Sequence, residues 1–257
     1  MAFLQLDFFS RALNVASSVN VILPEPDQGI GVGASKGDRK PKVLYLLHGY
    51  SDDHSIWMRR TSVERYVSEY NIAVIMPAVN HSYYCNEAQG ERYWDYISEE
   101  LPNAMKGFFN ISSSPEDTFA AGLSMGGYGA MKLALTYPER FSAVGCFSGV
   151  LDVADPARYE GEEKAKKERI FGPVEKIAGS ENDLFYLMKK SENAPSKPKL
   201  YISCGTSDFL YGSFKKFVPE IKKHGFDVTT FEKPDETHNW RFWDEEIAKF
   251  IPFAFGS

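Results

Sequence analysis

Five short apolar runs alternate with segments of helical periodicity, and this alternation most constrains the fold. The runs cover residues 43–47, 72–76, 118–121, 143–147 and 199–203. Strands that are buried on both faces have this composition. Apolar residues at helical spacing occur at 55–69, 93–109, 125–136 and 211–224. The pattern predicts an α/β fold with a doubly wound, mostly parallel sheet.

The two ends of the chain complete this sheet. Residues 3–9 and 13–23 are rich in β-favouring residues around a short polar break, which predicts an antiparallel hairpin at one edge. A last strand is expected at 226–231 and a closing helix at 240–250. The glycine-rich, polar stretch 29–42 predicts a connecting loop. We expect one domain over 1–257, with residues 151–198 forming a small cap insertion.

Composition excludes several classes of partner. The chain has 29 Lys+Arg against 35 Asp+Glu, a net charge of -6, which gives no attraction to phosphate backbones. We therefore expect no nucleic-acid partner. No signal peptide or membrane-spanning run is evident, so a cytoplasmic protein is expected. The three cysteines lack metal-ligand spacing, and neither a disulfide framework nor a metal site is predicted.

A G-x-S-x-G motif, GLSMG, places Ser124 directly between an apolar strand and a helical run. This is the strand–turn–helix context in which a serine hydroxyl projects from a strained turn as a nucleophile. Small residues are needed on both sides, and Gly122 and Gly126 supply them. Chance rarely provides the motif together with its context, so Ser124 is the predicted nucleophile.

A serine nucleophile needs a general base, and two histidines follow Ser124 in the chain. His224 precedes Gly225 at the expected end of a helix, where a structural capping role is favoured. His238 lies in the polar loop PDETHNW, after the last predicted strand and before the closing helix. His238 is therefore the predicted base.

The base in turn needs an acid that fixes its tautomer. Asp208 follows the strand KLYISCG, at the sheet edge where the other catalytic loops are expected. Asp235 is the alternative, but it lies only three residues before His238. Asp208 is the predicted acid.

An oxyanion hole requires two backbone N–H donors. The residue after the nucleophile, Met125, supplies one, and the loop after an early strand supplies the other, assigned to Tyr50 in His48-Gly49-Tyr50. We expect His48 to be structural. Together with His48, the residues DDH at 52–54 resemble a metal cluster, but they lack zincin spacing, and a polar loop is favoured.

The chain resembles the esterase D-like superfamily of α/β-hydrolases, particularly bacterial tributyrin esterases. The resemblance covers nearly the whole chain and rests on the segments GLSMGGYGA, CGTSDFLY, THNWRFW, LLHGYSDDHSIWMRRTSVERY and YISEELP. It implies hydrolysis of short-chain acyl esters (acetyl to butyryl) without a cofactor, in a fold often found as a homo-oligomer. The matching motifs carry over Ser124, Asp208 and His238 as the triad.

Other functions stay open. Related S-formylglutathione hydrolases usually show GHSMGGHGA, a histidine motif like DHSYYF and a cysteine near the oxyanion loop, and this chain departs from all three. Feruloyl or carbohydrate acetyl ester cleavage also occurs among similar folds. A non-catalytic binding protein is the alternative from another class, because fold does not imply function. The intact Ser, Asp and His order favours a serine carboxylesterase acting on a small-molecule ester.

Overall fold

The computed structural model describes residues 1–25, 39–156 and 159–256, so most of the predicted connector at 29–42 lies outside the described residues. Its centre is one eight-stranded sheet in the order β1-β2-β4-β3-β5-β6-β7-β8. The strands are β1 (Ala2–Ser10), β2 (Val15–Leu23), β3 (Lys42–Leu47), β4 (Ile72–Pro77), β5 (Thr118–Leu123), β6 (Ala143–Phe147), β7 (Lys199–Gly205) and β8 (Val228–Lys233).

The direction of the strands confirms the predicted sheet. β1 and β2 form an antiparallel hairpin, and β2 joins β4 antiparallel. From β4 to β8 every neighbouring pair is parallel. The apolar strands β3 to β6 are almost wholly buried, as strands covered on both faces should be. Because parallel strands share one direction, the loops that follow them meet at one edge of the sheet.

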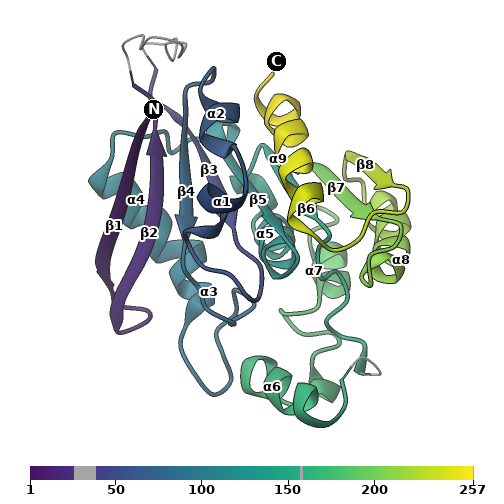
Figure 1. The fold of residues 1–257 in the computed structure, drawn as a ribbon. Coiled ribbons are helices and arrows are strands. Elements are labelled where there is room, and N and C mark those ends of the chain that lie inside the picture. Colours follow the sequence, from purple (N-terminus) through teal and green to yellow (C-terminus); the bar gives the residue numbers. More distant parts are fainter. Residues whose placement is uncertain (26–38, 157–158, 257) are drawn as a thin grey trace.

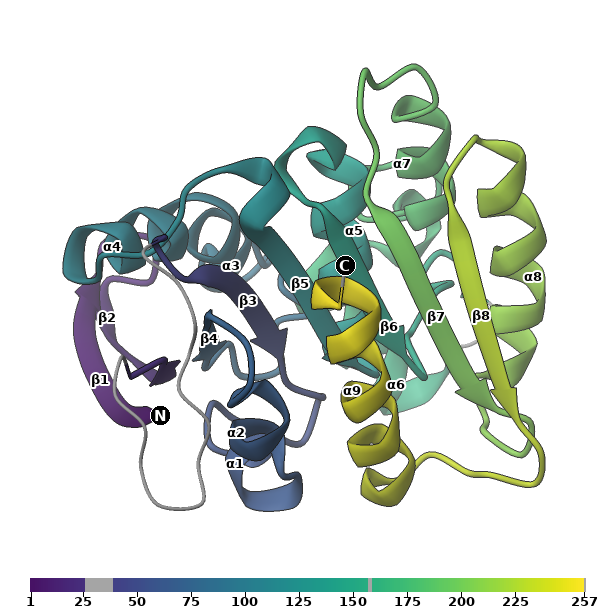
Figure 2. The ribbon, with the colours of Figure 1, turned by 90° about the horizontal axis from the view of Figure 1, so that it is seen from above.

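Helices cover both faces of the sheet. They are α1 (Ile56–Arg60), α2 (Val63–Val67), α3 (Tyr93–Asp95), α4 (Leu101–Phe108), α5 (Met125–Thr136), α6 (Gly161–Phe171), α7 (Leu184–Lys190), α8 (Tyr211–Lys223) and α9 (Trp240–Phe255). Figure 2 shows α1, α2 and α9 on one face and α4, α5, α7 and α8 on the other. Each layer has its own apolar core against the sheet. The doubly wound prediction is confirmed.

The predicted helix at 55–69 is divided into α1 and α2. Thr61 separates them in an extended conformation. Its hydroxyl donates to the Trp57 carbonyl oxygen and accepts from the Val63 N–H, at 2.6 and 3.2 Å. A threonine that bonds backbone groups in this way competes with the helical ladder. One helix was therefore the wrong expectation here.

The predicted helix at 93–109 contains a π-helical turn, Tyr96–Glu100, between α3 and α4. Pro102 has no N–H and cannot donate to the Ser98 carbonyl four residues before it. Arg140 donates to that carbonyl instead, at 3.3 Å. A side chain from a distant segment thus satisfies the group that the proline leaves open. Short 3-10 turns also occur at Pro115–Asp117, Pro138–Arg140 and Val174–Lys176.

The segment 151–198, predicted to be a cap, has two distinct parts. α7 packs beside α5 and α8, and the rings of Phe185 and Phe217 lie 5.4 Å apart. α6 instead lies beyond the sheet, at the bottom of Figure 1. The carbonyls of Arg169 and Ile170 at its end accept from the N–H groups of Gln89 and Ala88. The capping role of the segment stays a prediction, and α6 is the part that matches it.

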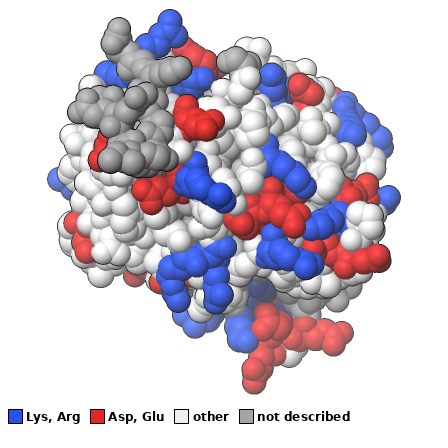
Figure 3. Space-filling model, turned by 45° about the horizontal axis from the view of Figure 1, so that its top comes forward, with Lys and Arg blue, Asp and Glu red and all other residues white. Residues whose placement is uncertain are grey.

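The charged side chains are mixed on the surface. On the face shown in Figure 3, basic and acidic side chains lie interspersed over the molecule. Among residues 1–25, 39–156 and 159–256, no helix has both the length and the apolar character needed to cross a bilayer.

Candidate active site

Ser124 lies at a sharp turn between β5 and α5. Its backbone has φ 51° and ψ -116°, a conformation that residues other than glycine rarely adopt. The glycines beside it allow close packing, because a Cβ at Gly122 would stand 2.4 Å from the Gly126 carbonyl oxygen. Larger residues at these positions would push α5 away from β5. The local sequence therefore produces the strained turn that a nucleophilic serine requires, with Ser124 half-buried.

His238 lies in the loop between β8 and α9, and it contacts Asp208 from the loop after β7. Its Nδ1 lies 2.8 Å from the Asp208 Oδ2. The other carboxylate oxygen of Asp208 accepts from the Leu210 N–H at 2.8 Å. A proton on Nδ1 that is donated to the carboxylate leaves Nε2 as the basic nitrogen. The arrangement can orient an imidazole for proton abstraction.

The carboxyl of Asp208 is held in its charged form. Burial by itself would raise the pKa, but the hydrogen bond and positive charge of His238 and the Leu210 N–H outweigh burial and lower it. A carboxylate that stays ionised can stabilise a protonated imidazole.

The alternative acid, Asp235, is exposed and takes another role. Its backbone N–H donates to the Thr206 Oγ1 at 2.9 Å. The structure thus brings Asp208 to His238, and not Asp235. The other candidate base, His224, is the C-cap residue of α8, as expected from the glycine that follows it.

A buried carboxylate holds the His238 loop in place. Glu236 accepts from the Asn239 side chain at 2.7 Å and from Arg241 at 2.9 Å. These bonds lower its pKa to about 2. The loop also packs directly on the end of β7, because a Cβ at Gly205 would stand 2.2 Å from the Glu236 carbonyl oxygen. The histidine loop is therefore fixed against the strand that precedes Asp208.

Three consecutive carbonyls of the predicted oxyanion loop are held by buried side chains. The Leu47 oxygen accepts from the Trp57 indole at 3.1 Å. The His48 oxygen accepts from the Tyr84 hydroxyl at 2.9 Å. The Gly49 oxygen lies 2.7 Å from the His48 Nδ1. Three successive carbonyls engaged in this way preorganise the start of the loop, which an oxyanion hole requires.

His48 is structural, in agreement with the sequence. Its Nε2 accepts from the Val79 N–H at 3.1 Å, so both ring nitrogens bond to the backbone. Burial lowers its pKa to about 4. In the described part of the chain, no group of three or more His, Cys, Asp or Glu is arranged to hold a metal ion.

The oxyanion loop lies against the candidate nucleophile. A Cβ at Gly49 would stand 3.8 Å from the Ser124 Cβ. Tyr50 directly follows this glycine, and Met125 begins α5, where the first N–H groups have no intrahelical acceptor. The predicted donors therefore come from two backbone segments that meet at Ser124.

Sequence reasoning missed three residues around the candidate site. Asp52 is half-buried beside Gly49, and this burial raises the pKa of its carboxyl. Phe209 is 76% exposed, and its ring lies 4.6 Å from that of His238. Trp243 meets the same imidazole edge-on at 4.8 Å. The only signal for Asp52 was its position in the loop that carries Tyr50.

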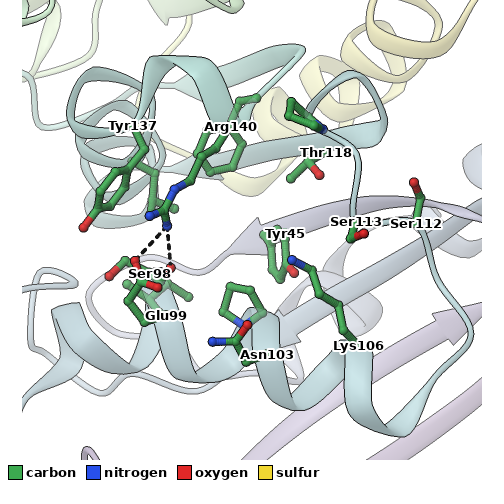
Figure 4. A pocket seen from close by; sticks show the side chains of 15 residues that line it. Tyr45, Ser98, Glu99, Asn103, Lys106, Ser112, Ser113, Thr118, Tyr137 and Arg140 are labelled. Atoms are coloured by element: carbon green, nitrogen blue, oxygen red, sulfur yellow. Dashed lines mark hydrogen bonds and ion pairs between the residues drawn. The ribbon is translucent and has the colours of Figure 1, made fainter.

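Two cavities lie near opposite ends of the parallel strands. One of about 640 Å³ begins at Tyr50 and His81 and reaches Lys166 and Arg169 of α6. Another, of about 300 Å³, lies between α4 and the end of α5 (Figure 4). It is lined by Thr118, where β5 begins, so it lies away from Ser124, which follows the end of that strand. The first cavity adjoins the candidate site.

Comparison with known proteins agrees with this geometry. The family model described as putative esterase matches residues 10–253. The chain belongs to this esterase family. An acetyl esterase of Caldicellulosiruptor saccharolyticus is 31% identical over 258 residues, which cover 96% of each chain. As a member of the family, the chain is a carboxylic ester hydrolase.

Solved structures place the esterase in the α/β-hydrolase fold. The fluorophosphonate-binding serine hydrolase F of Staphylococcus aureus is 35% identical, with a TM-score of 0.87 and 98% of both chains covered. An S-formylglutathione hydrolase of the same organism is also 35% identical, with a TM-score of 0.85 and the same coverage. The resemblance to the esterase D-like group is thus confirmed.

Proposed function

We propose that this esterase is a serine carboxylesterase that hydrolyses short-chain acyl esters through an acyl-enzyme. The observation that carries the proposal is the 2.8 Å contact of His238 with Asp208, together with the φ of 51° at Ser124 in the turn between β5 and α5. A serine on a strained turn and an oriented imidazole are the elements that acyl transfer needs. Similarity to an acetyl esterase over 96% of both chains supports the short acyl group.

The proposed residues divide the steps of the cycle among them. The His238 Nε2 removes the Ser124 hydroxyl proton while the oxygen attacks the ester carbonyl, and Asp208 stabilises the imidazolium. The N–H groups of Tyr50 and Met125 donate to the oxyanion. His238 then returns the proton to the leaving alcohol. A water molecule activated by the same imidazole hydrolyses the acyl-enzyme and frees the serine.

The test is a substrate series with the wild type and Ser124→Ala. p-Nitrophenyl esters from acetate to palmitate, methyl ferulate and S-formylglutathione would be compared by kcat/KM. We expect activity that depends on Ser124 and falls as the acyl chain lengthens. A preference for ferulate would redirect the substrate class. Equal rates for wild type and variant on every substrate, with no labelling of Ser124 by an organophosphonate, would indicate a non-catalytic protein.

A second candidate substrate is an anionic thioester such as S-formylglutathione. The cavity that begins at Tyr50 is lined by the cationic Lys166 and Arg169, which suit a carboxylate of the thiol moiety, and also by the acidic Glu87 and Glu91. Similarity to an S-formylglutathione hydrolase supports this candidate. Arg169→Gln would raise KM for the thioester and leave p-nitrophenyl acetate unaffected. If Arg169→Gln changed neither KM, the cavity would not be part of the binding site for the thioester.

A further inference from the structure

A buried thiol meets a buried amine beneath the candidate site. The Lys132 Nζ on α5 lies 3.2 Å from the Sγ of Cys85, in the segment that follows β4. Cys85 is fully buried and Lys132 is 3% exposed. The two residues are 47 positions apart in the chain, so the contact joins separate segments of the fold.

The surroundings of this amine are unusual for a buried lysine. Its Nζ donates to the Asn182 Oδ1 at 2.7 Å and lies 4.4 Å from the centre of the Trp94 ring. Within the part of the chain that the structure describes, no carboxylate forms an ion pair with it. Buried lysines are ordinarily paired with acidic groups. Here the amine faces an amide, an aromatic ring and a thiol.

A cavity adjoins the amine of this pair, and Cys85 itself does not line it. This cavity of about 360 Å³ is lined by Lys132, Trp94 and Asn182. Cys146 and Cys204 are also buried and free, but among the described residues neither contacts a lysine. Burial raises the pKa of Cys146 to about 12. The chain therefore contains two internal controls for the chemistry of Cys85.

We propose that Cys85 and Lys132 are a redox-sensitive pair that a peroxide cross-links covalently. A peroxide oxygen is transferred to the thiol, giving a sulfenic acid, and the peroxide is reduced to water. The lone pair of the Lys132 amine then attacks sulfur. The S–O bond breaks, an S–N bond forms, and the hydroxyl leaves with an amine proton as a second water. Ester hydrolysis uses neither residue, so the pair is independent of the proposed function.

The cross-link would act on the scaffold of the candidate site. Lys132 lies two turns after Ser124 on the same helix, and Cys85 follows Tyr84, whose hydroxyl holds the His48 carbonyl. Joining the two segments would tie the nucleophile helix to the support of the oxyanion loop. A covalent link across a long stretch of chain also restricts the unfolded state. The oxidised protein should therefore melt at a higher temperature.

Peptide mass spectrometry of the full-length protein after hydrogen peroxide treatment tests the pair. We expect a Cys85–Lys132 peptide pair lighter than its parts by two hydrogens, reversed by dithiothreitol. A second peroxide equivalent would transfer one oxygen to the linked sulfur, giving a sulfinamide and water, and this heavier peptide pair also supports the proposal. The melting temperature should rise by several degrees with the cross-link and fall again on reduction.

Two variants make the result decisive. Cys85→Ser and Lys132→Gln should each lose the cross-linked peptide and the peroxide-dependent rise in melting temperature. If Lys132→Gln fails to fold, the comparison of Cys85→Ser with the wild type still tests the cross-link. Serine differs from cysteine only in having oxygen in place of sulfur. Oxidation of Cys85 to sulfinic acid without a peptide pair would overturn the proposal. So would equal oxidation of Cys146 and Cys204 with no cross-link in the wild type.

Discussion

Gly126 at the start of α5 lies directly against the backbone of Leu47 at the end of β3. A Cβ at Gly126 would stand 2.3 Å from the Leu47 carbonyl oxygen and 2.7 Å from that of His48. The first turn of the nucleophile helix and the start of the oxyanion loop are thus in backbone contact. The spacing of the two catalytic segments depends on the absence of one side chain.

Gly126→Ala should therefore destabilise the protein and lower activity. Overpacking at such a contact costs about 1–3 kcal/mol in the free energy of unfolding, measured by urea denaturation. The matched control is Gly107→Ala, because a Cβ at Gly107 in α4 meets nothing within 4 Å. Alanine there should raise the free energy of unfolding by about 1 kcal/mol. Equal effects of the two changes would contradict the packing argument.

Asp208→Asn should reduce kcat by roughly four orders of magnitude, because an amide allows the wrong histidine tautomer and cannot stabilise an imidazolium. The measurement is steady-state hydrolysis of p-nitrophenyl acetate. Asp235→Asn is the control and should retain wild-type kcat, since its side chain is exposed. A large loss in the Asp235 variant with a small loss in the Asp208 variant would reverse the assignment of the acid.

Ser124→Gly should be more stable than Ser124→Ala, although both lack the hydroxyl. The turn at φ 51° strains any residue with a Cβ by about 1–3 kcal/mol, and glycine relieves that strain at some entropic cost. The expected net difference is about 1 kcal/mol, or roughly 2–4 °C in melting temperature for a chain of this size. Identical melting temperatures would show that the turn carries no strain.

His48 should make the protein sensitive to acid. Its folded pKa of about 4 is below its ordinary value of 6.5 because the buried ring resists protonation. Stability from the neutral ring is fully present above pH 6.5 and is lost as pH falls towards 4. The loss amounts to about 3 kcal/mol. Denaturation at pH 7 and pH 4 should show this loss in the wild type but not in His48→Gln.

Much of the fold could be predicted because its signals are local. The apolar runs, the glycines around Ser124 and the helix 125–136 each depend on neighbours in the chain. The division of 55–69 could not be predicted, since the Ser62 N–H that opens α2 donates to Asp244 of α9. The π-helical turn likewise depends on Arg140 from another segment.

The sequence by itself determined the α/β class, and it predicted the position of the nucleophile turn and the choice between two histidines. These inferences follow from the apolar periodicity, the glycines around Ser124 and the order of the motifs along the chain. All three can be read without knowing any tertiary contact. Only the tertiary structure decided the pairing of His238 with Asp208, the bonds that hold the oxyanion loop, and the contact of Cys85 with Lys132. Such contacts join residues tens of positions apart, and packing of the sheet and its two helical layers brings them within bonding distance.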